Sequence, residues 1–272
     1  MTMSGVVTYV GRSSMEVEVT LSQNSVPALI ASFTLVARDD TTGKSASINT
    51  LHLSTPEEHA RFALGKERKL RKKEASATCL SKVAPTADEY QLLHTSFLHP
   101  PGTDCVSPTD TQLQSVILCH PQHKNMKKSI FGGYLMQESF ALAWATAHVF
   151  AGQRPVFRAV DEISFLRPVS IGQTDKTHVV FSLCSTGDII ELTSAVVYSH
   201  TQPVPSLQIR VETKILDISQ TGVHKTCNVA HYTFDVPEDA TLRTIHPHTY
   251  SEAMDMLDGR RRHARAFEVG AE

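Results

Sequence analysis

Two glycines and an asparagine near the middle of the chain have the types and spacing to stabilise a negatively charged oxygen and to orient a water molecule. Gly132 and Gly133 open a stretch, 130–150, that is predicted to be a long helix. The first backbone N–H groups of a helix lack an intrahelical acceptor and lie at the positive end of the helix dipole. Glycine lets a ligand approach such donors closely. Asn125, shortly before them, carries no charge and can both donate and accept a hydrogen bond.

Each of these residues also has an ordinary structural explanation. The glycines could simply bring the helix close to a sheet, and Asn125 could be a turn residue that binds its own backbone. We favour the chemical interpretation because of the wider motif described below.

Other residues that could do chemistry are less complete. His120 and His123 have a spacing that can ligate zinc, but no nearby cysteine or carboxylate completes a site, so we expect no metal and no cofactor. The five cysteines form no C-x-x-C pair, which favours a reducing compartment over a disulfide framework. The absence of G-x-S-x-G argues against a serine hydrolase elbow.

The predicted helix is apolar on nearly all sides, and this suggests that it is buried on nearly all sides. Long strands follow it, with turn signals between them. A long antiparallel sheet curled around one helix, the hotdog fold, would satisfy this pattern, and so would a generic α+β core helix. We expect these strands near 156–165, 177–184, 189–199, 207–217 and 225–234.

The first part of the chain predicts strands over 5–38 and then helices. Thr55 and Thr86 each begin a capping box that ends on a glutamate three residues later. Tyr9 to Ser14 resembles Ser170 to Asp175 in pattern, a weak sign of two copies of one unit. The piece before Gly11 is too short for the helix and strand that precede Gly172, so we expect that the first unit lacks its central helix, or that the natural chain starts upstream.

Composition narrows the class of protein. Charged residues make up 20% of the 272 residues and the net charge is −2, so nothing favours a nucleic-acid partner or an anionic membrane. No apolar run is long enough for a membrane-spanning helix. The basic run 66–73 could meet phosphates, but a solvated helix face is the simpler interpretation.

The stretch from His120 to Val169 resembles the acyl-CoA thioesterase family. His120 to Asn125 followed by Ile130 to Met136 is similar to that family's proline, asparagine and Gly-Gly start of the central helix. Ala159 to Val169 is similar to its D-x-I-x-F-x-x-P-V strand and turn. The segments 246–252 and 257–261 resemble the tail of the mitochondrial branch.

The resemblance implies hydrolysis of fatty acyl-CoA to a free acid and coenzyme A, without metal or cofactor. It assigns Asn125, Gly132 and Gly133 to catalysis, and Phe131 and Asp161 to substrate binding. The general base is the difficulty. Phe140 occupies the helical position where related double hotdogs carry an aspartate, and Glu138 lies about 200° around the helix from it.

We therefore expect an α+β protein of two fused hotdog units, each a long central helix wrapped by antiparallel sheet, with the first unit incomplete. Residues 1–100 would form the partial first unit, 101–112 a linker and 113–272 the second unit. The resemblance implies a mitochondrial location, and an uncovered sheet face would favour a homo-oligomer. Two other functions stay open: an impaired acyl-CoA binding or regulatory protein, and a dehydratase that uses His120 or His123.

Overall fold

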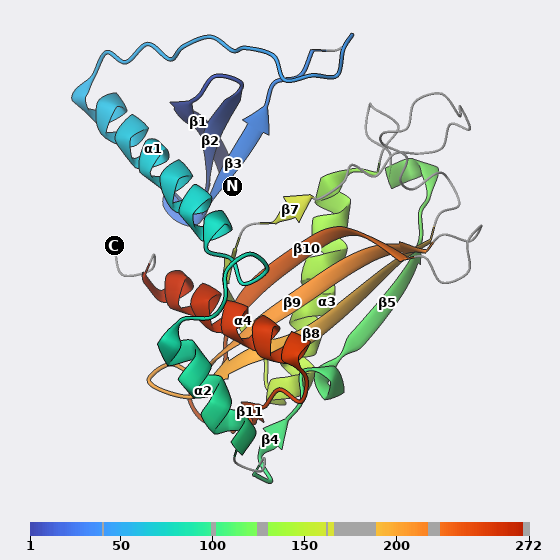
Figure 1. Ribbon diagram of the computed structural model, residues 1–272. Helices are drawn as coiled ribbons and strands as arrows, with labels where there is room; N and C mark the ends of the chain where they lie inside the picture. The colour runs from blue at the N-terminus through green and yellow to red at the C-terminus, as the bar shows by residue number, and fades with distance from the viewer. Residues whose placement is uncertain are drawn as a thin grey trace. The chain divides into compact units, whose positions relative to one another are not determined.

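The computed structural model describes residues 1–39, 41–98, 102–123, 130–161, 163–165, 189–216 and 224–268 (Figure 1). The chain divides into two compact units, Met1–Ala84 and Pro85–Glu272. Among the described residues, no helix is both long and apolar enough to cross a bilayer.

The first unit is a three-stranded antiparallel sheet with one helix, as the strand and capping patterns predicted. Its strands follow the order β1 (Thr2–Val10), β2 (Ser14–Gln23) and β3 (Val26–Val36). Asn24 and Ser25 connect β2 to β3 with φ of 50° and 65°, the geometry of a tight hairpin turn. Helix α1 (Pro56–Ala77) starts at the Thr55 capping box.

Helix α1 covers the polar face of this sheet. Glu16 is 4% exposed, accepts a hydrogen bond from Thr8 Oγ1 at 2.9 Å and forms an ion pair with Arg68 of α1 at 2.7 Å. The apolar side chains of β2 face away from α1, beside β3, where Phe33 is 45% and Leu35 is 50% exposed. The buried carboxylate is tolerated because two partners compensate its charge.

The second unit is built on a six-stranded antiparallel sheet. The strand order is β5-β8-β9-β10-β6, and β7 pairs with β10 beyond β6. The expected strand near 177–184 lies outside the described residues. The bounds of the strands are Leu113–Leu118 for β5, Val156–Val160 for β6, Ser164–Phe165 for β7, Ile189–His200 for β8, Ser206–Leu216 for β9 and His224–Asp235 for β10.

Helix α3 (Gly132–Ala151) lies along one face of this sheet. Leu135, Ala143 and Ala147 are almost fully buried against it. Tyr232 of β10 donates to Ser139 of α3 at 3.0 Å, which fixes the contact inside the core. A long helix wrapped by antiparallel sheet confirms the expected hotdog arrangement. Burial on all sides was wrong, because the sheet covers one face only and Val149 is 67% exposed.

Helix α4 (Tyr250–Glu268) covers the opposite face of the same strands. The side chain of Tyr232 points to α3, whereas its neighbour His231 lies 3.8 Å from Asp258 of α4. Because adjacent side chains of a strand point to opposite faces, the sheet lies between the two helices. Figure 1 shows α4 in front of the sheet and α3 behind it.

The boundary between the units differs from the expected one. Helix α2 (Ala87–Leu98) belongs to the second unit, because Glu89 accepts two hydrogen bonds of 2.6 Å from Arg261 of α4. The segment expected as a linker contains the 3-10 turn η1 (Thr109–Thr111) and β4 (Cys105–Val106), which pairs with β11 (Thr244–Ile245). Described residues of 101–112 are therefore part of a folded unit.

Candidate active site

The start of α3 presents backbone donors. Phe131, the N-cap residue, makes no side-chain cap to the helix. Its carbonyl accepts from Tyr134 N at 3.0 Å and its N–H donates to the His123 carbonyl at 2.8 Å. In the part of the chain that the structure describes, no acceptor lies on the N–H groups of Gly132 or Gly133.

Gly133 also has a steric role. A Cβ atom at this position would lie 2.4 Å from Cε1 of Phe131, so the ring of Phe131 packs directly on the glycine. Phe131 itself is 59% exposed. The glycine therefore permits close packing against the N-cap residue, and its role in catalysis stays a prediction.

Asn125 lies outside the described residues, so its role stays a prediction. The described residue closest before it is His123, at the end of η2 (Pro121–His123). The hydrogen bond between the His123 carbonyl and the Phe131 N–H brings this residue to the first turn of α3.

His120 and His123, whose spacing could ligate zinc, make aromatic ring contacts in the structure. The ring of His123 lies 3.7 Å from that of Tyr134, nearly parallel at 13°, and His120 meets His123 edge-on. Burial, together with Glu138 and Cys119, raises the pKa of Tyr134. Within the described ranges, no cluster of three or more histidine, cysteine or acidic side chains could hold a metal ion.

Phe140 lies in an aromatic cluster. Its ring centroid is 5.3 Å from that of Phe157, 5.9 Å from that of Tyr232 and 6.0 Å from that of Phe234. Phe140, which the resemblance places where related double hotdogs carry an acid, thus packs among aromatic side chains. The resemblance alone had located this position, and no acid of the described residues replaces it in the cluster.

Asp161 follows β6 directly. Its N–H donates to the His231 carbonyl at 3.0 Å. Its carboxylate accepts from Arg262 at 2.7 Å and from Arg265 at 3.0 Å, both on α4. The predicted contact with substrate is untested, but the carboxylate already has two cationic partners. Sequence reasoning missed both arginines, because nothing in their local pattern indicates a partner a hundred positions away.

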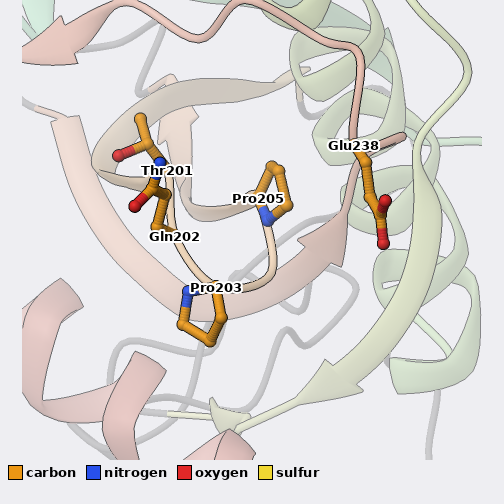
Figure 2. Close-up of a pocket in the computed structure, with 5 residues that line it drawn as sticks. All are labelled: Thr201, Gln202, Pro203, Pro205 and Glu238. Atoms are coloured by element: carbon orange, nitrogen blue, oxygen red, sulfur yellow. The ribbon is translucent and has the colours of Figure 1, made fainter.

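A depression at the β8–β9 turn contains none of these residues. Figure 2 shows it lined by Thr201, Gln202, Pro203, Pro205 and Glu238. Its walls are a turn and a loop, and it contains neither the start of α3 nor any other residue predicted for catalysis. We assign it no role in catalysis.

Comparison with solved structures finds acyl-CoA hydrolases and thioesterases. An acyl-CoA hydrolase from Staphylococcus aureus is 23% identical, with 61% of this chain and 95% of that chain covered and a TM-score of 0.48. A hexameric acyl-CoA thioesterase is 18% identical, with 61% of this chain and 97% of that chain covered and a TM-score of 0.49. No family model matches the chain.

Comparison with curated proteins gives longer relatives. Mitochondrial acyl-coenzyme A thioesterase 9 from Bos taurus and from Homo sapiens are each 35% identical over 95% of this chain. Mitochondrial acyl-coenzyme A thioesterase 4 from Humulus lupulus is 32% identical over 93% of it. The chain spans 58% of the length of the first two relatives and 50% of the third. Over nearly all of its length, this chain is therefore similar in sequence to part of the mitochondrial acyl-coenzyme A thioesterases.

Proposed function

We propose that the protein hydrolyses the thioester of fatty acyl-coenzyme A to the free acid and coenzyme A. The observation that carries this proposal is the start of α3, where the N–H groups of Gly132 and Gly133 have no acceptor among the described residues. Homology to thioesterases over 95% of the chain supplies the reaction class.

Each part of the site has one task. Water adds to the thioester carbonyl carbon, and the negative charge that develops on the oxygen is stabilised by the Gly132 and Gly133 N–H groups. Asn125 orients the water or the thioester. The C–S bond then breaks, and the sulfur leaves as the coenzyme A thiolate, which takes up a proton. The attacking water loses one proton as it adds, and the thiolate gains one as it leaves, so each thioester consumes one water.

A thiol-release assay with acyl-CoAs of several chain lengths tests this function. Asn125→Ala should lower the rate of release by about 100-fold if it removes one positioned polar group. Asn24→Gly is the matched control, because it replaces an asparagine in a hairpin turn whose positive φ glycine also adopts. Equal release by Asn125→Ala and the unmodified protein would remove Asn125 from the mechanism.

The aromatic cluster around Phe140 supports one alternative. Without an acid at this position, the protein could bind acyl-CoA as a catalytically impaired or regulatory protein. Calorimetry with a non-hydrolysable acyl-CoA thioether distinguishes the two functions. Binding of the analogue without any release of thiol from acyl-CoA would favour the alternative.

We further propose that the first unit is a partial hotdog and that the protein is a mitochondrial homo-oligomer. The face of the first sheet opposite α1 is apolar, as expected where a central helix would lie. In the second unit, Val116, Val149 and Val156 are 63%, 67% and 62% exposed, and a second copy could cover them. The names of the relatives support the mitochondrial location.

A further inference from the structure

The bend between β6 and β7 is held from two directions. On the sheet side, Val160 pairs with Tyr232 and Ser164 pairs with Val229, so β10 carries both strands. The Asp161 N–H donates to the His231 carbonyl between these two pairs. On the α4 side, the Asp161 carboxylate accepts from Arg262 and Arg265.

The two arginines are themselves oriented. Arg262 Nε donates to Asp258 Oδ2 at 2.6 Å, one turn earlier on α4, while its NH1 group reaches Asp161. The side chains of Arg262, Asp258 and Asp161 are 21%, 27% and 31% exposed. A charge pair this sheltered, with a second carboxylate that orients the guanidinium, is held more firmly than a surface ion pair.

The buried group beneath the network does not compete for the carboxylate. His231 is 6% exposed and lies 3.8 Å from Asp258. Burial, and then Arg262, Arg210 and Arg265, lower the pKa of His231 well below its usual value, so the ring is neutral at pH 7. The charge that balances Asp161 comes from α4.

The bend leads toward the start of α3. Phe157 of β6 contacts Phe140, and from Phe157 the chain runs along β10 past Tyr232 to Asn228. Asn228 pairs with Thr213, and this register continues through Leu192 to Ser115, so β7 lies level with the middle of β5. Figure 1 shows β7 and the first turns of α3 at the same end of the second unit.

We propose that Arg262 and Arg265 are positioning residues for thioester hydrolysis. They hold Asp161, and Asp161 holds the β6–β7 bend and β7 in the place that the site at the start of α3 requires. Asp161 thus acts through the backbone that follows it and does not contact the substrate. This inference rests on the proposed thioesterase function, because positioning has meaning only for a working site.

Three variants separate positioning from stability. Asp161→Asn and Arg265→Gln each remove one side of the contact and keep a similar shape. Arg261→Gln is the matched control, since Arg261 is the neighbour of Arg262 on α4 and makes an ion pair of the same kind with Glu89, at 28% side-chain exposure. The control changes the attachment of α2 but leaves the β6–β7 bend intact.

The measurement is kcat and KM for acyl-CoA, determined separately. We expect Asp161→Asn and Arg265→Gln each to lower kcat by about 10-fold with little change in KM, because a site displaced by a fraction of an ångström loses rate before affinity. The double variant should be no slower than the slower single variant, because both act through one contact. Arg261→Gln should keep kcat within about two-fold.

Other outcomes overturn the inference. A rise in KM with unchanged kcat would indicate that Asp161 contacts the substrate. Additive losses of kcat in the double variant would show that Asp161 and Arg265 act independently. An equal loss of kcat in Arg261→Gln would show that the variants act by lowering stability and not by displacing the site.

Hydrogen exchange keeps this test distinct from that of the proposed function. If the unmodified protein releases no thiol from acyl-CoA, the proposed thioesterase function is refuted. In that case, faster amide exchange in β6 and β7 for the Asp161 and Arg265 variants alone would still support the contact as the support of the bend. Equal exchange in all three variants would refute it.

Discussion

At the residue scale, the start of α3 combines close packing with open donors. The Phe131 ring fills the space that a side chain at position 133 would need, and this space lies beside the N–H groups proposed to bind the thioester oxygen. A change at this position therefore affects geometry at the site more than stability of the helix.

Gly133→Ala should abolish most thiol release. The added Cβ would clash with the Phe131 ring, so the ring must move from its place beside the first turn of α3. The free energy of unfolding should change by less than about 1 kcal/mol, because alanine favours the helix by a similar amount. Gly152→Ala is the control: its φ of 66° makes alanine strained, but the site is far along α3, so stability should fall and release should persist. Full activity of Gly133→Ala would contradict the assignment.

His263 should make stability depend on pH. Its Nε2 atom lies 2.7 Å from Ser206 Oγ, and burial and then His200 lower the pKa of His263 to about 4. The unfolded chain, with a histidine pKa near 6.5, binds more protons between these values. Stability from this group is therefore present above pH 6.5 and lost as pH falls toward 4, by up to about 3 kcal/mol.

Urea unfolding at pH 7.5 and pH 5 checks this prediction. His263→Gln keeps a polar partner for Ser206 and removes the titration, so the free energy of unfolding should fall less on acidification than in the unmodified protein. Equal falls in both proteins would assign the pH dependence to other groups, His231 among them.

At the element scale, α4 organises one face of the second unit. It contacts β8, β9 and β10, holds α2 through Arg261 and reaches the β6–β7 bend through Arg262 and Arg265. The same helix thus supports both α2 and the connection from β6 to β7.

Glu89→Gln should loosen α2 without loss of activity. The ion pair with Arg261 lowers the pKa of Glu89 to about 2, so its stabilisation is present above the unfolded pKa of about 4.5 and lost as pH falls toward 2. The variant should lower the free energy of unfolding by about 1–2 kcal/mol at pH 7. Unfolding at pH 7 and pH 3 should show a smaller difference between the two proteins at pH 3. A constant difference would contradict the ion-pair explanation.

At the scale of the whole molecule, exposed apolar surface predicts self-association. Val149 of α3 and Val156 of β6 are both more than half exposed in the second unit. Surfaces of this kind are usually covered by a partner.

Light scattering coupled to size exclusion should give a mass that is a multiple of 30.0 kDa. The double variant Val149→Lys, Val156→Lys should shift the mass toward one chain, because a buried lysine without a partner is costly. Val204→Lys, at the β8–β9 turn, is the control and should leave the mass unchanged. A single-chain mass for the unmodified protein would refute the proposed oligomer.

Short-range sequence patterns determined where the helices begin and end. The apolar run over 130–150 specified α3 to within two residues, and the capping boxes located the starts of α1 and α2, because these features depend on neighbours a few residues apart. The resemblance then pointed to Gly132 and Gly133, which the structure places in the first turn of α3.

Only the tertiary structure decided which charges meet and which faces are covered. In the first unit, α1 packs on the side of β2 that carries Glu16, where Arg68 compensates the carboxylate. In the second unit, Asp161 is bound by two arginines of α4, and its predicted contact with substrate stays a prediction. Such pairings join residues far apart in the chain, and their strength depends on distance and burial, which no local pattern encodes.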